Sequence, residues 1–410
     1  MSQTAMPAAT RTPLPVWAVV LAAGTIVGMA MGLRQVMGLY LQPITTGIGI
    51  GREPFSDAMA IANLVWGIGA IATGAIADRK GAGRVIVTCA LATSVGLYLM
   101  HAARDGWELY ISGLLLGVGV AGTGVTALVG AVGRAAPADK RTAAIASLGM
   151  AGGIGQLIAL PYTHLLIEYL GWKSSLLALS ATALLMIPLA YPLAGKPISV
   201  DTGAKPQSLT EAFSEAFAHP SFWLLTVGFF VCGFHVAFYG VHLPAFVADK
   251  GLEPWVGVAA IMMVGVANII GTFVAGRSTK LIERRIGLSF IYFARCFIFL
   301  GLLYVPITPT TIIFLSTLLG FFWLSTVPLT SSLVAIFFGT TWMSMLFGFV
   351  FLSHQLGSFA GLKLAGMFYD ATKSYDTMWW ISIALGLFAA LIHWPIKERP
   401  VARLLPAAAE

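Results

Sequence analysis

The feature that most constrains this chain is a series of twelve apolar windows, each long enough to cross a lipid bilayer. A spanning helix needs about 20 predominantly apolar residues, and it satisfies its backbone hydrogen bonds within the segment. Only 10% of the residues are charged, so water cannot be the solvent for most of the surface. The windows lie at 16–44, 55–77, 85–101, 107–132, 142–167, 174–193, 221–248, 255–276, 287–305, 311–338, 342–369 and 377–396. We therefore expect an all-α membrane protein with twelve transmembrane helices.

The longest polar interval, residues 194–220, separates six windows from the next six. It contains glycine, proline and charged residues, followed by a short amphipathic run, which is typical of a linker. We expect an N-terminal six-helix bundle at 1–193, a cytoplasmic linker at 194–220 and a C-terminal six-helix bundle at 221–410.

The two halves resemble each other. When Pro43 is aligned with Pro244, Arg34 falls over His235. Duplicated six-helix halves are a known plan of transporters, in which the solute site lies near the bilayer midplane between the halves. The repeat therefore predicts two pseudo-symmetric bundles with a site between them.

The lysines and arginines indicate the orientation. With the N-terminus inside, 16 of the 24 fall on the cytoplasmic side and five fall outside, as expected when basic residues mark cytoplasmic loops. This explains the net charge of +7 without a nucleic-acid partner. We expect a multi-pass protein of the cell membrane, in a bacterium the inner membrane, which functions as a monomer in the lipid bilayer with both termini in the cytoplasm.

One arginine, Arg34, lies deep in the first window, where it is the only charged residue. A charge at such depth costs roughly 2.5–3.5 kcal/mol on insertion scales, so it normally faces the bundle interior or a water-filled cavity. The alternative is that Arg34 extends to the outer interface and anchors the helix.

Two further cations, Arg295 and Lys363, fall within windows, whereas all 17 acidic residues can be assigned to loops or helix ends. Buried charges require a partner, and a guanidinium can bind a carboxylate through two parallel hydrogen bonds. We therefore predict that the missing partner is the substrate, a small organic anion, mono- or dicarboxylate, carried by alternating access. Arg295 could reach the cavity, pair within the protein or extend to the interface. Lys363 is expected to be an interface anchor near the outer end.

Polar side chains on other spans could complete the site. His235 can donate to a carboxylate and titrates near physiological pH, which makes it a candidate proton carrier, although simple packing is equally open. The amide side chains of Gln156 and Gln355 could orient the solute or form hydrogen bonds between helices. Trp66 and Asn268 are further lining candidates. The predicted substrate-binding residues are Arg34, Gln35, Asn63, Gln156, His235, Tyr239, Arg295 and Gln355.

The loop after the second window carries a recognisable motif, with Gly74, Asp78, Arg79 and Gly81 at fixed spacing before further basic residues. This resembles the signature loop of the major facilitator superfamily. The loop after the eighth window, with Arg277, is a degenerate copy without the aspartate. The resemblance implies a twelve-helix carrier in which these five residues take part in conformational gating.

Further segments resemble the oxalate/formate antiporter and monocarboxylate porter branch of that superfamily. These are residues 34–43, 55–56, 152–156, 171–173, 232–235, 242–244 and 353–357. The resemblance implies that Arg34, the cation of the first span, helps to hold a substrate carboxylate. Relatives often place an aspartate and an arginine in the eighth span, where this chain has Asn268 and Thr272. Proton symport therefore does not follow from the resemblance. Anion exchange, proton symport with the substrate or a histidine carrying the proton, and facilitated diffusion all fit the sequence, in either direction.

Other functions are less compatible with the sequence. No HExxH, GxSxG or P-loop pattern is present, so we do not expect an enzyme. The three cysteines lie in separate apolar stretches without metal-ligand spacing, so no metal and no cofactor are predicted. The alternative within transporters is a major facilitator carrier for a larger or neutral solute, such as a drug or a vitamin.

Overall fold

The computed structural model describes residues 15–137, 141–194, 208–339 and 342–404. Within these ranges the chain is helical, and eleven helical runs are long and apolar enough to cross a membrane. The longest of them, Ser147–Leu189, has 43 residues and is interrupted by a turn at Gly171, so it is counted as two crossings. The prediction of an all-helical protein with twelve membrane-crossing helices is therefore confirmed for the described part of the chain. Residues 1–14 and 405–410 of the termini and 195–207 of the predicted linker lie outside it.

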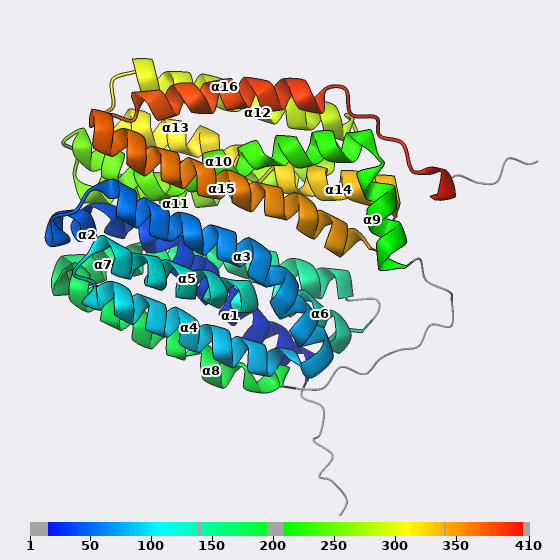
Figure 1. Ribbon diagram of the computed structural model, residues 1–410, viewed down its shortest axis with the longest axis horizontal. Helices are drawn as coiled ribbons and strands as arrows, with labels where there is room; N and C mark the ends of the chain where they lie inside the picture. The colour runs from blue at the N-terminus through cyan, green and yellow to red at the C-terminus, as the bar shows by residue number, and fades with distance from the viewer. Residues whose placement is uncertain (1–14, 138–140, 195–207, 340–341, 405–410) are drawn as a thin grey trace, which may run out of the picture.

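The helices fall into two groups, one on each side of the linker (Figure 1). The N-terminal group holds α1 (Val16–Gln35), the 3-10 helix η1 (Val36–Tyr40), α2 (Leu41–Ile48), α3 (Arg52–Lys80), α4 (Ala82–Ala102), α5 (Gly106–Thr123), α6 (Val125–Ala135), α7 (Arg141–Leu184), α8 (Met186–Leu189) and η2 (Tyr191–Leu193). The C-terminal group holds α9 (Leu209–Phe217), α10 (Pro220–Asp249), α11 (Pro254–Ser278), α12 (Arg284–Tyr304), α13 (Pro309–Phe321), α14 (Thr326–Phe338), α15 (Met343–Thr372), α16 (Asp376–His393) and η3 (Ala402–Leu404).

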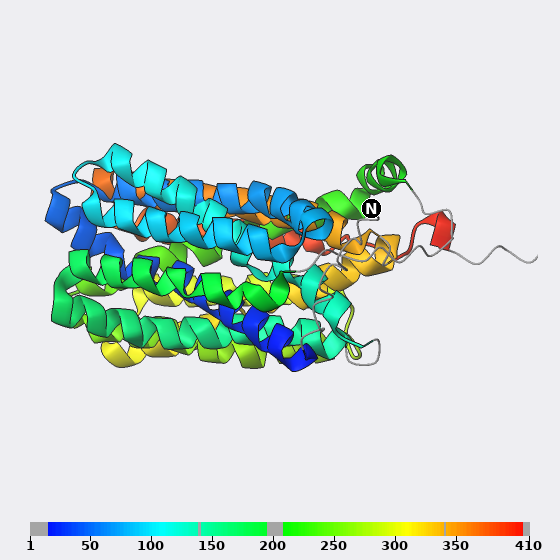
Figure 2. The ribbon, with the colours of Figure 1, turned by 90° about the horizontal axis from the view of Figure 1, so that it is seen from below.

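The helices run along the long axis of the molecule, and α1 crosses its neighbours obliquely (Figure 2). Small residues allow the closest approaches. A side chain at Gly113 in α5 would collide with the backbone of Ala58 in α3, and one at Gly155 in α7 would collide with the backbone of Gly28 in α1. Backbones can come this close where glycine is present, which is how membrane helices gain packing energy without a hydrophobic driving force between them.

Several predicted spans are interrupted. The predicted fifth and sixth spans form the continuous run α7, which turns at Gly171, where φ is +74°. The predicted fourth span is broken at Gly124 between α5 and α6, and the tenth between α13 and α14. The first span changes from α1 to the 3-10 helix η1 directly after Gln35. Hydropathy did not predict the breaks, because they do not interrupt the apolar run.

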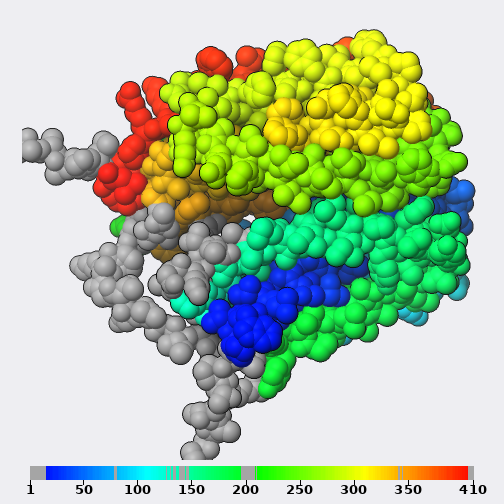
Figure 3. All heavy atoms as spheres, turned by 180° about the vertical axis from the view of Figure 1, so that it is seen from behind, coloured from blue at the N-terminus to red at the C-terminus, as the bar shows by residue number. Residues whose placement is uncertain are grey.

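The two ends of the molecule differ. We call the end at which α3 begins the Arg52 end, and the opposite end, which carries α9, the linker end (Figure 1). Toward the Arg52 end, α7 and α11 lie against each other, whereas the surface is hollowed between the groups toward the linker end (Figure 3). The two groups are therefore in contact at one end and separated at the other.

The short helix α9 lies at the linker end. It begins with a capping box, in which the Glu211 N–H donates to the Ser208 hydroxyl (3.2 Å) and the Ser208 N–H donates to the Glu211 carboxylate (2.8 Å). These hydrogen bonds hold the pKa of Glu211 below its ordinary value. Ala212 and Ala216 on the other face are buried. The amphipathic run noted in the sequence is thus a helix packed on the C-terminal group.

Candidate functional site

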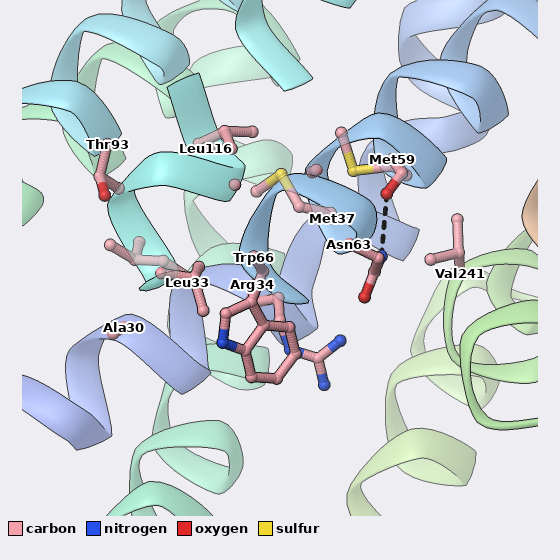
Figure 4. Close-up of a pocket in the computed structure, with 13 residues that line it drawn as sticks. Ala30, Leu33, Arg34, Met37, Met59, Asn63, Trp66, Thr93, Leu116 and Val241 are labelled. Carbon is pink, nitrogen blue, oxygen red and sulfur yellow. Dashed lines mark hydrogen bonds between the residues drawn. The ribbon is translucent and has the colours of Figure 1, made fainter. Parts of the chain in front are cut away.

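A cavity lies beside the middle of the first span (Figure 4). Its walls come from α1, α3, α4 and α5, with one residue from α10 and one from η1. Most of the lining is apolar, and Arg34 is the charged residue in it. The lining residues are Ala30, Leu33, Arg34, Met37, Met59, Ala62, Asn63, Trp66, Thr93, Leu116, Gly117, Val120 and Val241.

Arg34 is held near the middle of the 33-residue helical run Val16–Ile48. Its guanidinium carbon lies 5.3 Å from the centre of the Trp66 ring, within the range of a cation–π interaction. Its Nε atom is buried and has no hydrogen-bond partner. Among the described residues, no carboxylate forms an ion pair with Arg34. Arg34 therefore faces the interior, not the lipid interface, and its positive charge is unpaired.

Two side chains of α3 flank this guanidinium. Asn63 and Trp66 are three residues apart and therefore share one face of the helix. The Asn63 Nδ2 group donates to the Met59 carbonyl at 2.8 Å, which leaves its side-chain oxygen turned toward the side of the cavity where the guanidinium lies (Figure 4). The Trp66 indole N–H is buried without a partner. The cavity thus offers one cation, one amide oxygen and one free indole N–H among apolar walls.

The amide side chains predicted for the site take different places. Gln35 lies beside the cavity, where its side chain faces Gly240 of α10. Gln355 of α15 is fully buried and donates to the Asn63 carbonyl of α3 at 3.0 Å, so it joins the two groups of helices. Gln156 is half-buried in α7 and does not line the cavity.

Three other predicted residues lie inside the C-terminal group and not on the cavity wall. The His235 Nε2–H group donates to the Ser382 carbonyl at 2.9 Å. Tyr239 is hydrogen bonded to the Ser316 hydroxyl at 2.7 Å. All three side chains, those of His235, Tyr239 and Arg295, are at most 1% exposed. The three residues were predicted to bind the substrate, but they do not line the cavity. The rotation of α10 and α12 about their axes turns these side chains into the packed interior of the group.

Arg295 holds the break in the tenth span. Its Nη2 group donates to the carbonyls of Phe322 and Trp323 at 2.6 Å each, at the C-terminal end of α13. Asn268 of α11 accepts from the Leu324 N–H at 2.9 Å. Both side chains thus satisfy backbone groups that the helix break leaves unpaired, as the last carbonyls of a helix require. Of the three alternatives for Arg295, the structure supports pairing within the protein.

Lys363 was expected to be an interface anchor, and this was wrong. Its ammonium group lies 2.9 Å from the Asp57 carboxylate and 3.2 Å from the Glu53 carboxylate, both on α3. Asp57 lies near the N-terminal end of α3, as the assignment of the acids to loops and helix ends expected, but its side chain is only 17% exposed. Lys363 therefore pairs with acids of α3 and joins the two groups of helices at the Arg52 end.

A larger polar cluster surrounds the first residues of α3. Arg52 donates to both carboxylate oxygens of Asp249, at 2.6 and 2.7 Å, and to the Tyr375 hydroxyl at 2.7 Å. Asp370 of α15 accepts from the backbone N–H groups of Arg52 and Glu53 at 2.8 Å each. A carboxylate at this place pairs with the free N–H groups and the positive end of the helix dipole. We call these residues the Arg52 cluster: Arg52, Glu53, Asp57, Asp249, Lys363, Asp370 and Tyr375.

The Arg52 cluster was missed in the sequence, where Arg52 was counted as an ordinary outer-loop cation. The spacing of Glu53 and Asp57 places both acids on one helix face. That spacing is the available signal, but it does not identify a basic partner some 300 residues away in the chain.

The predicted gating residues lie near the linker end. Gly81 ends α3 with φ of +92°, a conformation that favours glycine and that supports the expected tight turn. No side chain approaches Gly74 within 4 Å, so it does not mediate a close helix contact here. Arg277 is exposed in the last turn of α11 and lies over the Phe273 ring. The side chains of Asp78 and Arg79 lie outside the described part.

Comparison with known proteins places the chain in a family. The model of the Major Facilitator Superfamily matches residues 18–362. The chain belongs to the major facilitator superfamily. Solved structures of similar fold include a bacterial homologue of the human lysosomal transporter Spinster (TM-score 0.73, 16% identity, 93% of this chain and 97% of that one). Another is a D-xylose–proton symporter (TM-score 0.73, 15% identity, 94% and 100%). These likenesses show the fold. The family, matched by its model, is one of carriers and not of enzymes.

Curated relatives of this facilitator match at low identity. Mouse (Mus musculus) monocarboxylate transporter 11 is 28% identical over 256 residues, covering 62% of this chain and 56% of the relative. Xenopus laevis monocarboxylate transporter 12 is 26% identical over 362 residues, covering 78% and 76%. A gallate transporter of Pseudomonas putida is 27% identical over 160 residues, covering 38% and 34%. The match thus spans little more than half of the mouse relative.

Proposed function

We propose that this facilitator transports a small organic anion bearing a carboxylate group, which binds Arg34. The observation that carries the proposal is the unpaired guanidinium in an apolar cavity. A cation at this depth without an ion-pair partner is costly, so an anion that enters the cavity is attracted to it. A carboxylate fits the planar guanidinium through two parallel hydrogen bonds.

The rest of the cavity supports an anion with an apolar body. The Trp66 ring and the methionine and leucine side chains of the wall can pack against hydrocarbon or aromatic carbons, and the Asn63 amide can bind a polar substituent. The relatives agree with this class, since two are monocarboxylate transporters and one is a gallate transporter.

We further propose that residues 1–193 and 221–410 move as two units about the linker at 194–220. The basic residues favour an orientation with both termini and the linker in the cytoplasm. In that orientation, the contacts of the Arg52 cluster close the outer side and the hollow at the linker end opens to the cytoplasm. Alternating access then requires the Arg52 cluster to separate in each cycle.

The test is counterflow in proteoliposomes with a panel of labelled mono- and dicarboxylates and one neutral solute of similar size. In Arg34→Gln, the charge-assisted hydrogen bonds are lost, and such bonds contribute about 1.5–3 kcal/mol each. We expect carboxylate uptake at subsaturating concentration to fall at least tenfold. The control is Arg104→Gln, which removes an exposed arginine in the loop before α5 and should transport as the wild type does.

Two results would contradict the proposal. One is unchanged carboxylate transport by Arg34→Gln. The other is transport of the neutral solute in preference to every carboxylate, which would support the alternative carrier for a larger or neutral solute.

A further inference from the structure

A histidine connects the two groups of helices beside the Arg52 cluster. His242 of α10 is 1% exposed, and both of its ring nitrogens have a partner. Its Nε2 lies 3.2 Å from the Ser56 hydroxyl of α3, and its Nδ1 lies 2.9 Å from the Tyr375 hydroxyl. Tyr375 in turn accepts from Arg52 of α3 at 2.7 Å. His242 therefore lies within a hydrogen-bonded chain that begins and ends on α3.

The direction of each hydrogen bond follows from its members. A guanidinium can only donate, so the Tyr375 oxygen accepts from Arg52 and its own proton is free for the Nδ1 atom of His242. Burial raises the pKa of the Tyr375 hydroxyl above its ordinary value, so that proton is retained. The Ser56 hydroxyl donates to the Arg52 carbonyl at 2.7 Å, so its oxygen accepts from Nε2. This pattern requires a neutral His242 with its proton on Nε2.

A second proton on His242 would disrupt this chain. It would place an N–H group on Nδ1 opposite the hydroxyl proton of Tyr375, and it would add a positive charge beside Arg52. Among the described residues, the acids of this region already have partners. Asp249 binds Arg52, and both Glu53 and Asp57 bind Lys363. Asp370 binds the first backbone N–H groups of α3. The charged and titratable groups around His242 are Arg52, Glu53 and Asp57 from α3, Asp249 from α10, Lys363, Tyr369 and Asp370 from α15, and Tyr375 before α16.

We propose that His242 is a proton-binding site whose protonation separates the two groups of helices at the Arg52 end. The closed arrangement holds the neutral imidazole, whereas separation would expose the ring to water, where a histidine side chain has a pKa of about 6.5. A proton then binds the open state in preference to the closed one, and binding shifts the equilibrium toward opening. With that pKa, a change from pH 7.5 to 5.5 raises the ratio of open to closed molecules about tenfold.

The inference does not depend on the substrate. It supplies a coupling site for protons in a chain without the aspartate and arginine of the eighth span. It also replaces His235 as the candidate proton carrier, because His235 lies inside the C-terminal group, where its contacts are the Ser382 carbonyl and the Phe234 and Phe299 rings. In the proposed orientation, acid on the outer side would favour opening to that side, as proton-coupled uptake requires.

The test measures opening directly, without a substrate. Spin labels are attached to cysteines introduced by Arg104→Cys and Thr310→Cys. Both positions are exposed near the Arg52 end, one on each group of helices. The native cysteines Cys89, Cys232 and Cys296 are buried. Distances between the labels are measured by pulsed electron resonance on the full chain in nanodiscs at pH 7.5 and 5.5. We expect the ratio of the long-distance to the short-distance population to rise about tenfold on acidification.

In His242→Gln, this pH response should disappear, whereas His235→Gln, which changes a buried histidine away from the interface between the groups, should retain it. A second variant, Tyr375→Phe, removes the opposing hydroxyl and keeps the histidine, so it should give a weaker pH response. The proposal is overturned if the wild type does not respond between these pH values, or if His242→Gln responds as the wild type does. If His242→Gln does not fold, Tyr375→Phe decides, and a response equal to that of the wild type overturns the proposal.

Discussion

The ion pair between Arg52 and Asp249 should control how firmly the Arg52 end is closed. The change to test is Asp249→Asn, which keeps the size of the side chain and removes its charge. The pair joins α3 of the N-terminal group to α10 of the C-terminal group through two parallel hydrogen bonds of 2.6 and 2.7 Å. Because the pair crosses between the groups, its loss should shift the conformational equilibrium and leave the fold of each group intact.

The magnitude follows from burial and geometry. The side chains of Arg52 and Asp249 are 8% and 24% exposed, so the pair is largely but not fully removed from water. Charge-assisted hydrogen bonds contribute about 1.5–3 kcal/mol each, and partial exposure reduces the total for the pair to about 2–3 kcal/mol. The open-to-closed ratio should therefore rise roughly 30- to 150-fold, at 1.4 kcal/mol for each factor of ten. Arg52→Gln should shift it further, since Arg52 also binds Tyr375 and lies 3.7 Å from the centre of the Tyr369 ring.

The assay is the label pair at positions 104 and 310, measured at pH 7.5, which is above the pKa of about 6.5 of a histidine in water. The matched control is Glu168→Gln, which removes an exposed acid that pairs within α7, with His164 at 3.8 Å. In the double variant Arg52→Gln/Asp249→Asn, the two effects should be less than additive, because both remove the same interaction. The reasoning is refuted if Asp249→Asn gives the same distance distribution as Glu168→Gln.

Three further changes test other parts of the structure. Trp66→Leu removes the ring over Arg34, and since a cation–π interaction contributes about 0.5–2 kcal/mol, carboxylate affinity in counterflow should fall about two- to thirtyfold. Arg295→Met leaves the carbonyls at the α13 break without their donor, so the free energy of unfolding should fall by about 2–4 kcal/mol, measured by thermal unfolding. The preference of transport for anions should not change. A changed preference would indicate that Arg295 binds the substrate. Gly155→Val should destabilise the chain by about 1–3 kcal/mol through its collision with α1, whereas Gly153→Val, with open space around it, should not.

The candidate site was only partly predictable. Arg34 could be found because a cation within a long apolar run is costly wherever the run lies, and the structure places it in the cavity. His235 was assigned by aligning the halves and Tyr239 as a polar lining residue, but neither an alignment nor polarity fixes the rotation of a helix about its axis. The sequence did not decide whether Arg295 reaches the cavity, pairs within the protein or extends to the interface. Depth in the membrane does not show which backbone groups of another helix remain unpaired. The partners of Arg295 exist only because the tenth span is broken.

The sequence by itself determined the twelve membrane-crossing helices and the presence of a cation in the first span. These are properties of single segments, since length, hydropathy and the cost of a buried charge do not depend on neighbours. The tertiary structure alone decided that Lys363 meets Asp57 and that His242 meets both Ser56 and Tyr375. Such pairs join residues that are far apart in the chain, and their geometry depends on how the two groups of helices dock, which no local pattern encodes.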